Sequence, residues 1–261
     1  PADRVNAFGR DDLATFVTEH YGPDQLILSA AGAVDHEAIV RQAHDLFGSM
    51  RPRPAQIADP ARFTGGETRH EKALAQAHMA LAFKAPGYRD PDFFAAQIYS
   101  IALGGGMSSR LFQEIREKRG LCYTIFAQSG AYSDTGMTMI YAGTSGEEVG
   151  DLAVLTMDEI KRAASDLSTA ELERARAQMK AGLLMGLESP SARAERMARM
   201  IQIWGEVPPI EKTVARIEAV TLDQMRAFAE KQAFTAPAAL ALYGPVSRAP
   251  GLSDLHLRRA A

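Results

Sequence analysis

The side chains best suited to chemistry are an arginine and a tyrosine seven residues apart, Arg116 and Tyr123. They lie in the segment 102–123, ALGGGMSSRLFQEIREKRGLCY, one near the end of a charged helical pattern and one at the start of a strand-like pattern. A guanidinium and a phenol both donate hydrogen bonds, so the pair could bind a substrate carbonyl or stabilise an oxyanion. The spacing equally fits a solvated helix face with i,i+4 pairs such as Glu114–Lys118.

The glycine triplet 104–106 of the same segment raises the question of phosphate binding, because helix N-termini attract anions. A P-loop requires a lysine followed by Ser or Thr after its last glycine, and this segment has no such lysine. The dinucleotide fingerprint G-x-G-x-x-G is also missing, and the glycines follow a helical pattern rather than a strand. A nucleotide-binding module is therefore disfavoured, and we expect a chain reversal in which Ser108 or Ser109 caps the next helix.

Metal-binding and nucleophilic signatures are missing from the sequence. The six histidines form neither H-E-x-x-H nor H-x-x-E-H; they are His20, His36, His44, His70, His78 and His256. His36 and His44 would lie about 12 Å apart along a helix, too far to share one ion. The single cysteine, Cys122, excludes an internal disulfide or a cysteine-based zinc site, and no base accompanies it. We expect no bound metal and no complete catalytic apparatus in this chain.

The composition is that of a globular protein. Apolar residues make up 46% of the 261 residues and charged residues 23%, with a net charge of −3. The charge gives no sign of a nucleic-acid partner, and no stretch approaches the roughly 18 apolar residues of a membrane span. Because the chain begins at a proline without a signal-peptide core, we expect that a segment was removed upstream; the cytoplasm is the default location.

Helical and strand-like patterns alternate along the chain, and one Pro- and Gly-rich stretch divides them. Helices are predicted at 10–21, 35–48, 90–103, 108–119 and 146–165 and after the capping boxes 168–171 and 221–224; strands are predicted at 25–32, 75–85, 238–244 and twice within 122–143. The stretch 49–68 holds three prolines and a glycine pair, which is typical of a linker.

The two ends of the chain also resemble each other. Residues 4–34 align without gaps on residues 216–246, with seven identities in 31 positions and the same order of helix, strand and glycine turn. The second copy is preceded by about 145 residues that have no counterpart before the first. The repeat therefore predicts the end of one domain followed by a complete second domain, with most of the first domain upstream of Pro1.

The segment 103–136, LGGGMSSRLFQEIREKRGLCYTIFAQSGAYSDTG, strongly resembles the C-terminal domain of the insulinase/pitrilysin-type zinc metallopeptidases, and most of all the bacterial relatives of mitochondrial processing peptidase. The likeness covers nearly the whole chain, including HYGPDQLILSAAGAVDHEAIV (20–40) and ELERARAQMKAGLLMGLESPSARAERMAR (171–199). It implies an α+β fold, with repeated domains of mostly antiparallel sheet packed by helices. The implied boundaries are 1–50 for the end of the N-terminal catalytic domain, 51–68 for a linker, 69–250 for the C-terminal peptidase domain and 251–261 for a tail.

The resemblance also implies a function for the longer protein. In the family, H-x-x-E-H and a downstream Glu in the N-terminal domain hold zinc, so the zinc ligands would lie upstream of this chain, which alone would be inactive. Arg116 and Tyr123 match the family's Arg-Tyr pair, which holds the substrate backbone and stabilises the tetrahedral intermediate. The glycine loop is shorter than that of the processing peptidase's non-catalytic subunit, which weakens any role in gripping presequences. The expected partners are a peptide substrate and the missing N-terminal domain or a partner subunit, with a dimer as an option. The alternative is a non-catalytic scaffold subunit of a heteromeric peptidase.

Overall fold

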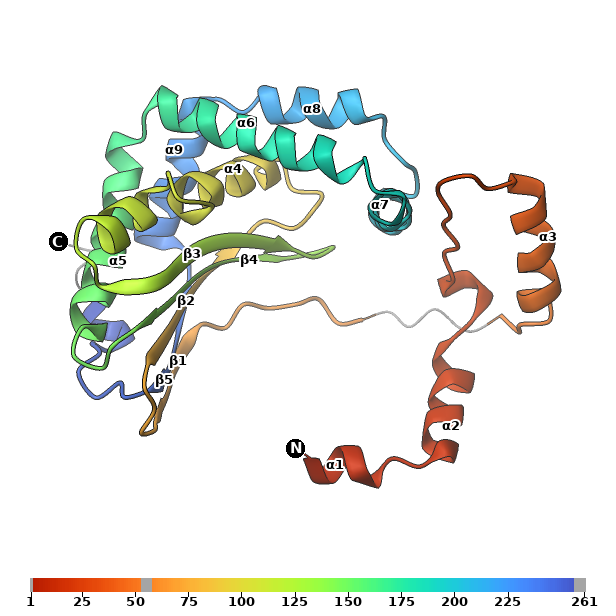
Figure 1. Ribbon diagram of the computed structural model, residues 1–261, viewed down its shortest axis with the longest axis horizontal. Helices are drawn as coiled ribbons and strands as arrows, with labels where there is room; N and C mark the ends of the chain where they lie inside the picture. The colour runs from red at the N-terminus through yellow and green to blue at the C-terminus, as the bar shows by residue number, and fades with distance from the viewer. Residues whose placement is uncertain (1, 53–57, 256–261) are drawn as a thin grey trace. The chain divides into compact units, whose positions relative to one another are not determined.

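A computed structural model describes residues 2–52 and 58–255 (Figure 1). Residues 53–57 of the predicted linker and residues 256–261 of the predicted tail lie outside the described residues. Contacts divide the chain into two units, one of residues 1–59 and 184–208 and the other of residues 60–183 and 209–261. None of the helices in the described ranges is long and apolar enough to cross a membrane.

The smaller unit consists of helices that bury no residue. They are α1 (Ala2–Ala7), α2 (Arg10–His20), the 3-10 turn η1 (Pro23–Gln25), α3 (His36–Phe47) and α7 (Pro190–Trp204). The prediction of a buried strand at 25–32 was wrong for this structure, because residues 26–32 join no sheet and Leu28 is 50% exposed. A strand is stable only when its backbone pairs with a neighbour, and none of the described residues supplies one.

The larger unit is built on a five-stranded sheet. Its strands are β1 (Gly66–Glu71), β2 (Ala77–Ala85), β3 (Cys122–Ala131), β4 (Gly136–Thr144) and β5 (Ala238–Gly244). They lie in the order β1-β5-β2-β4-β3, and every pairing is antiparallel except the parallel pair β1–β5. This arrangement confirms the predicted α+β class with a mostly antiparallel sheet.

β1 is not predicted by the sequence pattern, and its first part falls within the predicted linker. Its sequence, GETRHE, has no apolar alternation, and all six residues are exposed. The strand forms because its backbone pairs with β5 in register from Gly66↔Ala239 to Glu71↔Gly244.

Helices cover one face of this sheet (Figure 1). They are α4 (Phe93–Gly104), the π-helix η2 (Phe112–Glu117), α5 (Val149–Asp166), α6 (Thr169–Gly186), α8 (Ile210–Glu218), α9 (Leu222–Glu230) and the π-helix η3 (Lys231–Thr235). Met79, Leu81 and Phe83 alternate along β2 and are buried beneath them, as the strand pattern predicts.

The glycine triplet serves close packing at the end of α4. A Cβ on Gly104 would lie 2.7 Å from the Cβ of Ala127 on β3, so only glycine lets the helix approach the strand this closely. The predicted capping role of a serine is corrected here: Ser109 Oγ donates a hydrogen bond of 2.6 Å to the carbonyl of Gly106, and no side chain caps η2.

Replacing Gly104 by alanine is expected to lower the free energy of unfolding by about 1–3 kcal/mol, the usual cost of overpacking a core. Gly106→Ala is the matched control, because a Cβ there would lie 3.4 Å from the flexible end of Gln178. Urea unfolding followed by circular dichroism would measure both. Equal stability of the two variants would contradict the packing role of Gly104.

Candidate functional site

The two residues that the sequence singled out lie on either side of the turn 118–121, Arg116 in η2 and Tyr123 in β3. Leu111 and Ile115 are fully buried and anchor the helical segment, and Gly120 ends it with a left-handed φ of 66°. The amide of Gly120 donates a 3.0 Å hydrogen bond to the carbonyl of Arg116, and the amide of Leu121 donates one of 3.2 Å to Ile115. The turn therefore holds the backbone of Arg116 in place.

On this helical segment, the guanidinium of Arg116 has hydrogen-bond donors that remain available. Its guanidinium lies over the ring of Phe112, 4.4 Å from the ring centre, and its ion pair with Glu117 spans 3.8 Å. Lys118 and Arg119 instead both bind Glu114, at 2.5 and 3.1 Å, and the first of these is the predicted i,i+4 pair. Among the described residues, no hydrogen bond occupies the Arg116 guanidinium, so a ligand could take its donors.

Tyr123 projects from an irregularity of β3. The register with β4 shifts between Cys122 and Thr124, so that Tyr123 occupies a β-bulge without a partner residue. The side chain is 83% exposed, which leaves the phenol hydroxyl accessible. Bulges commonly re-aim one side chain next to a functional site, and sequence patterns do not reveal them.

Arg116 lies near the end of η2 and Tyr123 near the start of β3, and within the described residues no hydrogen bond joins their side chains. Burial raises the pKa of Cys122, the residue before Tyr123, to about 11, and the positive charge of Arg116 partly opposes that rise. A buried thiol with a raised pKa is a poor nucleophile, which agrees with the missing base in the sequence.

A zinc site does not fit the described residues, since no three side chains of His, Cys, Asp or Glu gather there as metal ligands.

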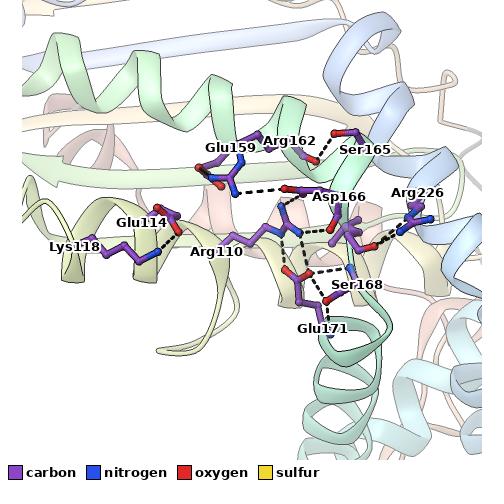
Figure 2. Close-up of polar contacts among 11 residues, drawn as sticks. Arg110, Glu114, Lys118, Glu159, Arg162, Ser165, Asp166, Ser168, Glu171 and Arg226 are labelled. Atoms are coloured by element: carbon purple, nitrogen blue, oxygen red, sulfur yellow. Dashed lines mark hydrogen bonds and ion pairs between the residues drawn. The ribbon is translucent and has the colours of Figure 1, made fainter.

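A cluster of ion pairs fixes the N-terminal end of the same helical segment (Figure 2). Arg110 Nε and Nη2 donate to the two carboxylate oxygens of Glu171, at 2.5 and 2.8 Å. Its Nη1 binds the carboxylate of Asp166, and its Nη2 also reaches the Asp166 carbonyl at 3.1 Å. Only 11% of the Arg110 side chain and 14% of the Glu171 side chain are exposed. This clamp joins the helical turn that begins at Arg110, just before η2, to the junction between α5 and α6.

Glu171 has two roles, of which the sequence predicted one. It forms the predicted capping box, accepting 2.9 and 2.7 Å hydrogen bonds from the amide and hydroxyl of Ser168. It also binds Arg110, 61 residues away, which no local pattern indicated. Burial raises the pKa of Glu171, but the hydrogen bonds from Arg110 and Ser168 outweigh it and hold the pKa at about 2.

Replacing Glu171 by glutamine is expected to make the free energy of unfolding depend less on pH under acidic conditions. The pKa of Glu171 falls from an ordinary value near 4.5 to about 2 in the folded protein. Ionised Glu171 therefore stabilises the folded protein fully at pH values above that ordinary pKa. That stabilisation is lost as the pH falls through about 2. Between pH 7 and pH 3, wild type should lose about 2 kcal/mol that Glu171→Gln does not lose.

Urea unfolding at several pH values measures this difference. The matched control is Glu173→Gln, which changes a 60% exposed carboxylate in the same helix. A Glu171→Gln variant that loses as much stability on acidification as wild type would contradict the assignment.

Glu159 of α5 has the opposite effect to Glu171 on the pH dependence of stability. Its side chain is 5% exposed, its Oε1 accepts a 2.6 Å hydrogen bond from Arg162, and burial raises its pKa. A raised carboxyl pKa favours the folded state at low pH, and this contribution is lost as the pH rises. Comparing Glu171→Gln with wild type cancels the contribution of Glu159.

Fold and site together define an α+β domain that offers an arginine and an exposed tyrosine at one end of its sheet. Residues 7–179 match the family described as "Peptidase M16 inactive domain", and the chain belongs to this family. The family resemblance read from 103–136 is thereby confirmed.

Relatives with known names agree with this assignment. The chain is 35% identical to an "uncharacterized zinc protease" of Streptomyces coelicolor, over 94% of this chain and 55% of that protein. It is 30% identical to a "probable mitochondrial-processing peptidase subunit beta" of Arabidopsis thaliana, over 99% of this chain and 51% of that protein. The chain therefore spans about half the length of these relatives.

The fold has a solved counterpart. A chain in "Complex III2 from Candida albicans, Inz-5 bound" matches 98% of this chain and 64% of its own length, with a TM-score of 0.87 and 18% sequence identity. At this identity the likeness concerns the fold alone.

Proposed function

We propose that this chain is the C-terminal portion of a zinc metalloendopeptidase that cleaves peptides or unfolded segments. In this proposal, Arg116 and Tyr123 bind the substrate backbone and stabilise the oxyanion of the tetrahedral intermediate. The proposal rests on the Arg116 guanidinium, which makes no hydrogen bond among the described residues, whereas the neighbouring cations Lys118 and Arg119 are bound to a carboxylate. The exposed Tyr123 lies just beyond the turn that follows Arg116. Free donors aimed at a developing negative charge are what an oxyanion site requires.

The smaller unit supports a longer parent protein. Its apolar side chains remain exposed, among them Val5, Phe8, Leu13, Phe16 and Leu46. Exposed apolar residues in such number need a partner surface. We assign residues 1–50 to the end of a preceding catalytic domain that supplies the zinc ligands. The linker 51–68, the C-terminal peptidase domain 69–250 and the tail 251–261 complete the proposed organisation.

A non-catalytic subunit of a heteromeric peptidase is the second candidate. It is favoured by the family's description as an inactive domain. In that case zinc would be held on another chain, and Arg116 and Tyr123 would serve peptide binding alone.

The coding sequence upstream of Pro1 distinguishes the two candidates. If it encodes H-x-x-E-H and a downstream Glu, the complete protein with zinc should hydrolyse an unfolded peptide, and chelation should abolish the activity. A region without the motif, or a complete protein that stays inactive with zinc, would contradict the peptidase proposal and favour the partner subunit. A peptide substrate, a homodimer and a cytoplasmic location belong to the same proposal; gel filtration and cell fractionation test the last two.

A further inference from the structure

The face of the sheet opposite α4, α5 and α9 carries a row of rings that crosses all five strands. His70 of β1 stacks on Tyr243 of β5 with ring centres 5.3 Å apart, and Tyr243 lies 6.4 Å from His78 of β2. His78 lies 6.1 Å from Tyr141 of β4, which lies 5.4 Å from Phe126 of β3. We call these five residues the aromatic row.

Specific contacts hold three of the rings in place. His78 Nδ1 and the Tyr141 hydroxyl form a 2.8 Å hydrogen bond, and Lys72 Nζ donates a 3.2 Å hydrogen bond to the Tyr243 hydroxyl. The rings are nonetheless accessible, since Tyr243 is 40% exposed, His70 is exposed and the other three are half-buried. The rings of the row are therefore both held in place and accessible to a ligand.

The spacing of the row matches an extended peptide. Side chains on one side of a strand repeat every 6.6–6.8 Å or so, and less where the strand is twisted. Neighbouring rings of the row are 5.3–6.4 Å apart. A peptide lying across the strands can therefore place alternate side chains on successive rings. Aromatic and aliphatic side chains gain most from such contacts.

The charges on this face determine which peptide charge it favours. Strand alternation places Lys84 and the row on one face, with small or neutral side chains between them: Thr68, Ala239, Ala241, Ala80, Met139, Thr124 and Gln128. Among these open-face strand positions there is no Asp or Glu, whereas Glu67 and Glu71 alternate to the other face and bind backbone amides there. The face therefore favours neutral or acidic peptides over basic ones.

The row also leads to the proposed site. Phe126, its last ring, lies three residues after Tyr123 on β3. A single-stranded nucleic acid could also stack on rings, but it needs many cations along its backbone. Among the described strand positions of this face and the residue that follows β1, the row is accompanied only by Lys72 and Lys84 as further cations, so a peptide fits better.

We propose that the aromatic row binds extended peptide segments in which apolar and acidic side chains alternate, and that it thereby selects the substrates of the proposed peptidase. The link to substrate selection rests on the proposed function, but peptide binding itself requires no zinc and no hydrolysis.

Fluorescence anisotropy with the complete 261-residue chain tests the proposal. The probe is a short labelled peptide that alternates Phe or Leu with Glu and Thr, at nanomolar concentration. Comparison probes replace Glu by Lys, group the apolar residues in one block, or consist of oligothymidylate. We expect the alternating acidic peptide to bind several-fold more tightly than each of the others.

Variants locate the binding on the row. Tyr243→Ala and Phe126→Ala should each weaken binding about fivefold or more, the usual scale of an aromatic contact. Tyr132→Ala is the matched control, because Tyr132 is 66% exposed and lies in the turn between β3 and β4. Lys84→Gln, which removes an exposed charge without touching a ring, should reduce the preference for acidic over basic peptide.

Unchanged binding in both ring variants and in Lys84→Gln, or tighter binding of the basic peptide or of oligothymidylate, would overturn the proposal. Lost peptide binding together with an Arg116-dependent peptidase would overturn this inference alone. Row-dependent binding in a complete protein that never hydrolyses peptides would overturn the proposed function and leave the row as a peptide-binding surface.

Discussion

Replacing Arg116 by alanine in the complete protein is expected to lower kcat/KM for peptide hydrolysis about 10²-fold or more, the scale for losing one donor to an oxyanion. The physical reason is that the guanidinium is not bound by a carboxylate within hydrogen-bond distance, since Glu117 lies 3.8 Å away. Its donors are therefore ready for charge that develops on a substrate. Steady-state kinetics with an unfolded peptide and saturating zinc measures the effect.

Two further variants sharpen this test. Arg116→Lys keeps the charge but loses the planar fork of donors, so it should restore only part of the activity. Arg119→Ala removes a cation from the same turn that is bound to Glu114, and it should leave kcat/KM nearly unchanged. If Arg116→Ala retained the kcat/KM of wild type, Arg116 would have no part in the mechanism, whatever Arg119→Ala did.

Tyr123 extends the test to the second member of the pair. Tyr123→Phe keeps the ring and removes only the hydroxyl, and the residue is too exposed for the change to disturb the core. A loss of activity in this variant without a loss of stability would assign the effect to the hydroxyl.

Replacing Arg110 by alanine is expected to lower the free energy of unfolding by about 3 kcal/mol, the scale for removing one partner of a buried ion pair. The change leaves the carboxylates of Glu171 and Asp166 without their shared partner, and Glu171 is 14% exposed. Desolvated charges without a partner are costly because protein surrounds them in place of water. Urea unfolding at pH 7 measures the loss.

The control for Arg110 lies in the turn that follows the same helical segment. Arg119→Ala breaks an ion pair whose arginine is 42% exposed, and exposed pairs contribute at most about 1 kcal/mol. The double variant Arg110→Met/Glu171→Leu removes both charges and should be more stable than Arg110→Ala alone. Equal losses in Arg110→Ala and Arg119→Ala would contradict the clamp described above.

Features that depend on neighbouring residues could be predicted from the order of the amino acids. The capping boxes at 168–171 and 221–224 both form, as does the pair Glu114–Lys118. The strand patterns at 75–85, 122–143 and 238–244 correspond to β2, β3, β4 and β5. Caps and alternation involve contacts within a few residues, so their energetics can be read from the order of the residues alone.

Contacts between groups far apart in the chain could not be predicted in this way and are seen in the folded structure. It paired the polar segment 66–71 with β5, left 26–32 unpaired, and brought Arg110 to Glu171. It also produced the bulge that exposes Tyr123 and aligned five rings from five strands. The physical reason is that strand register and ion pairing join residues far apart in sequence, so their free energy depends on how the whole sheet and its helices pack.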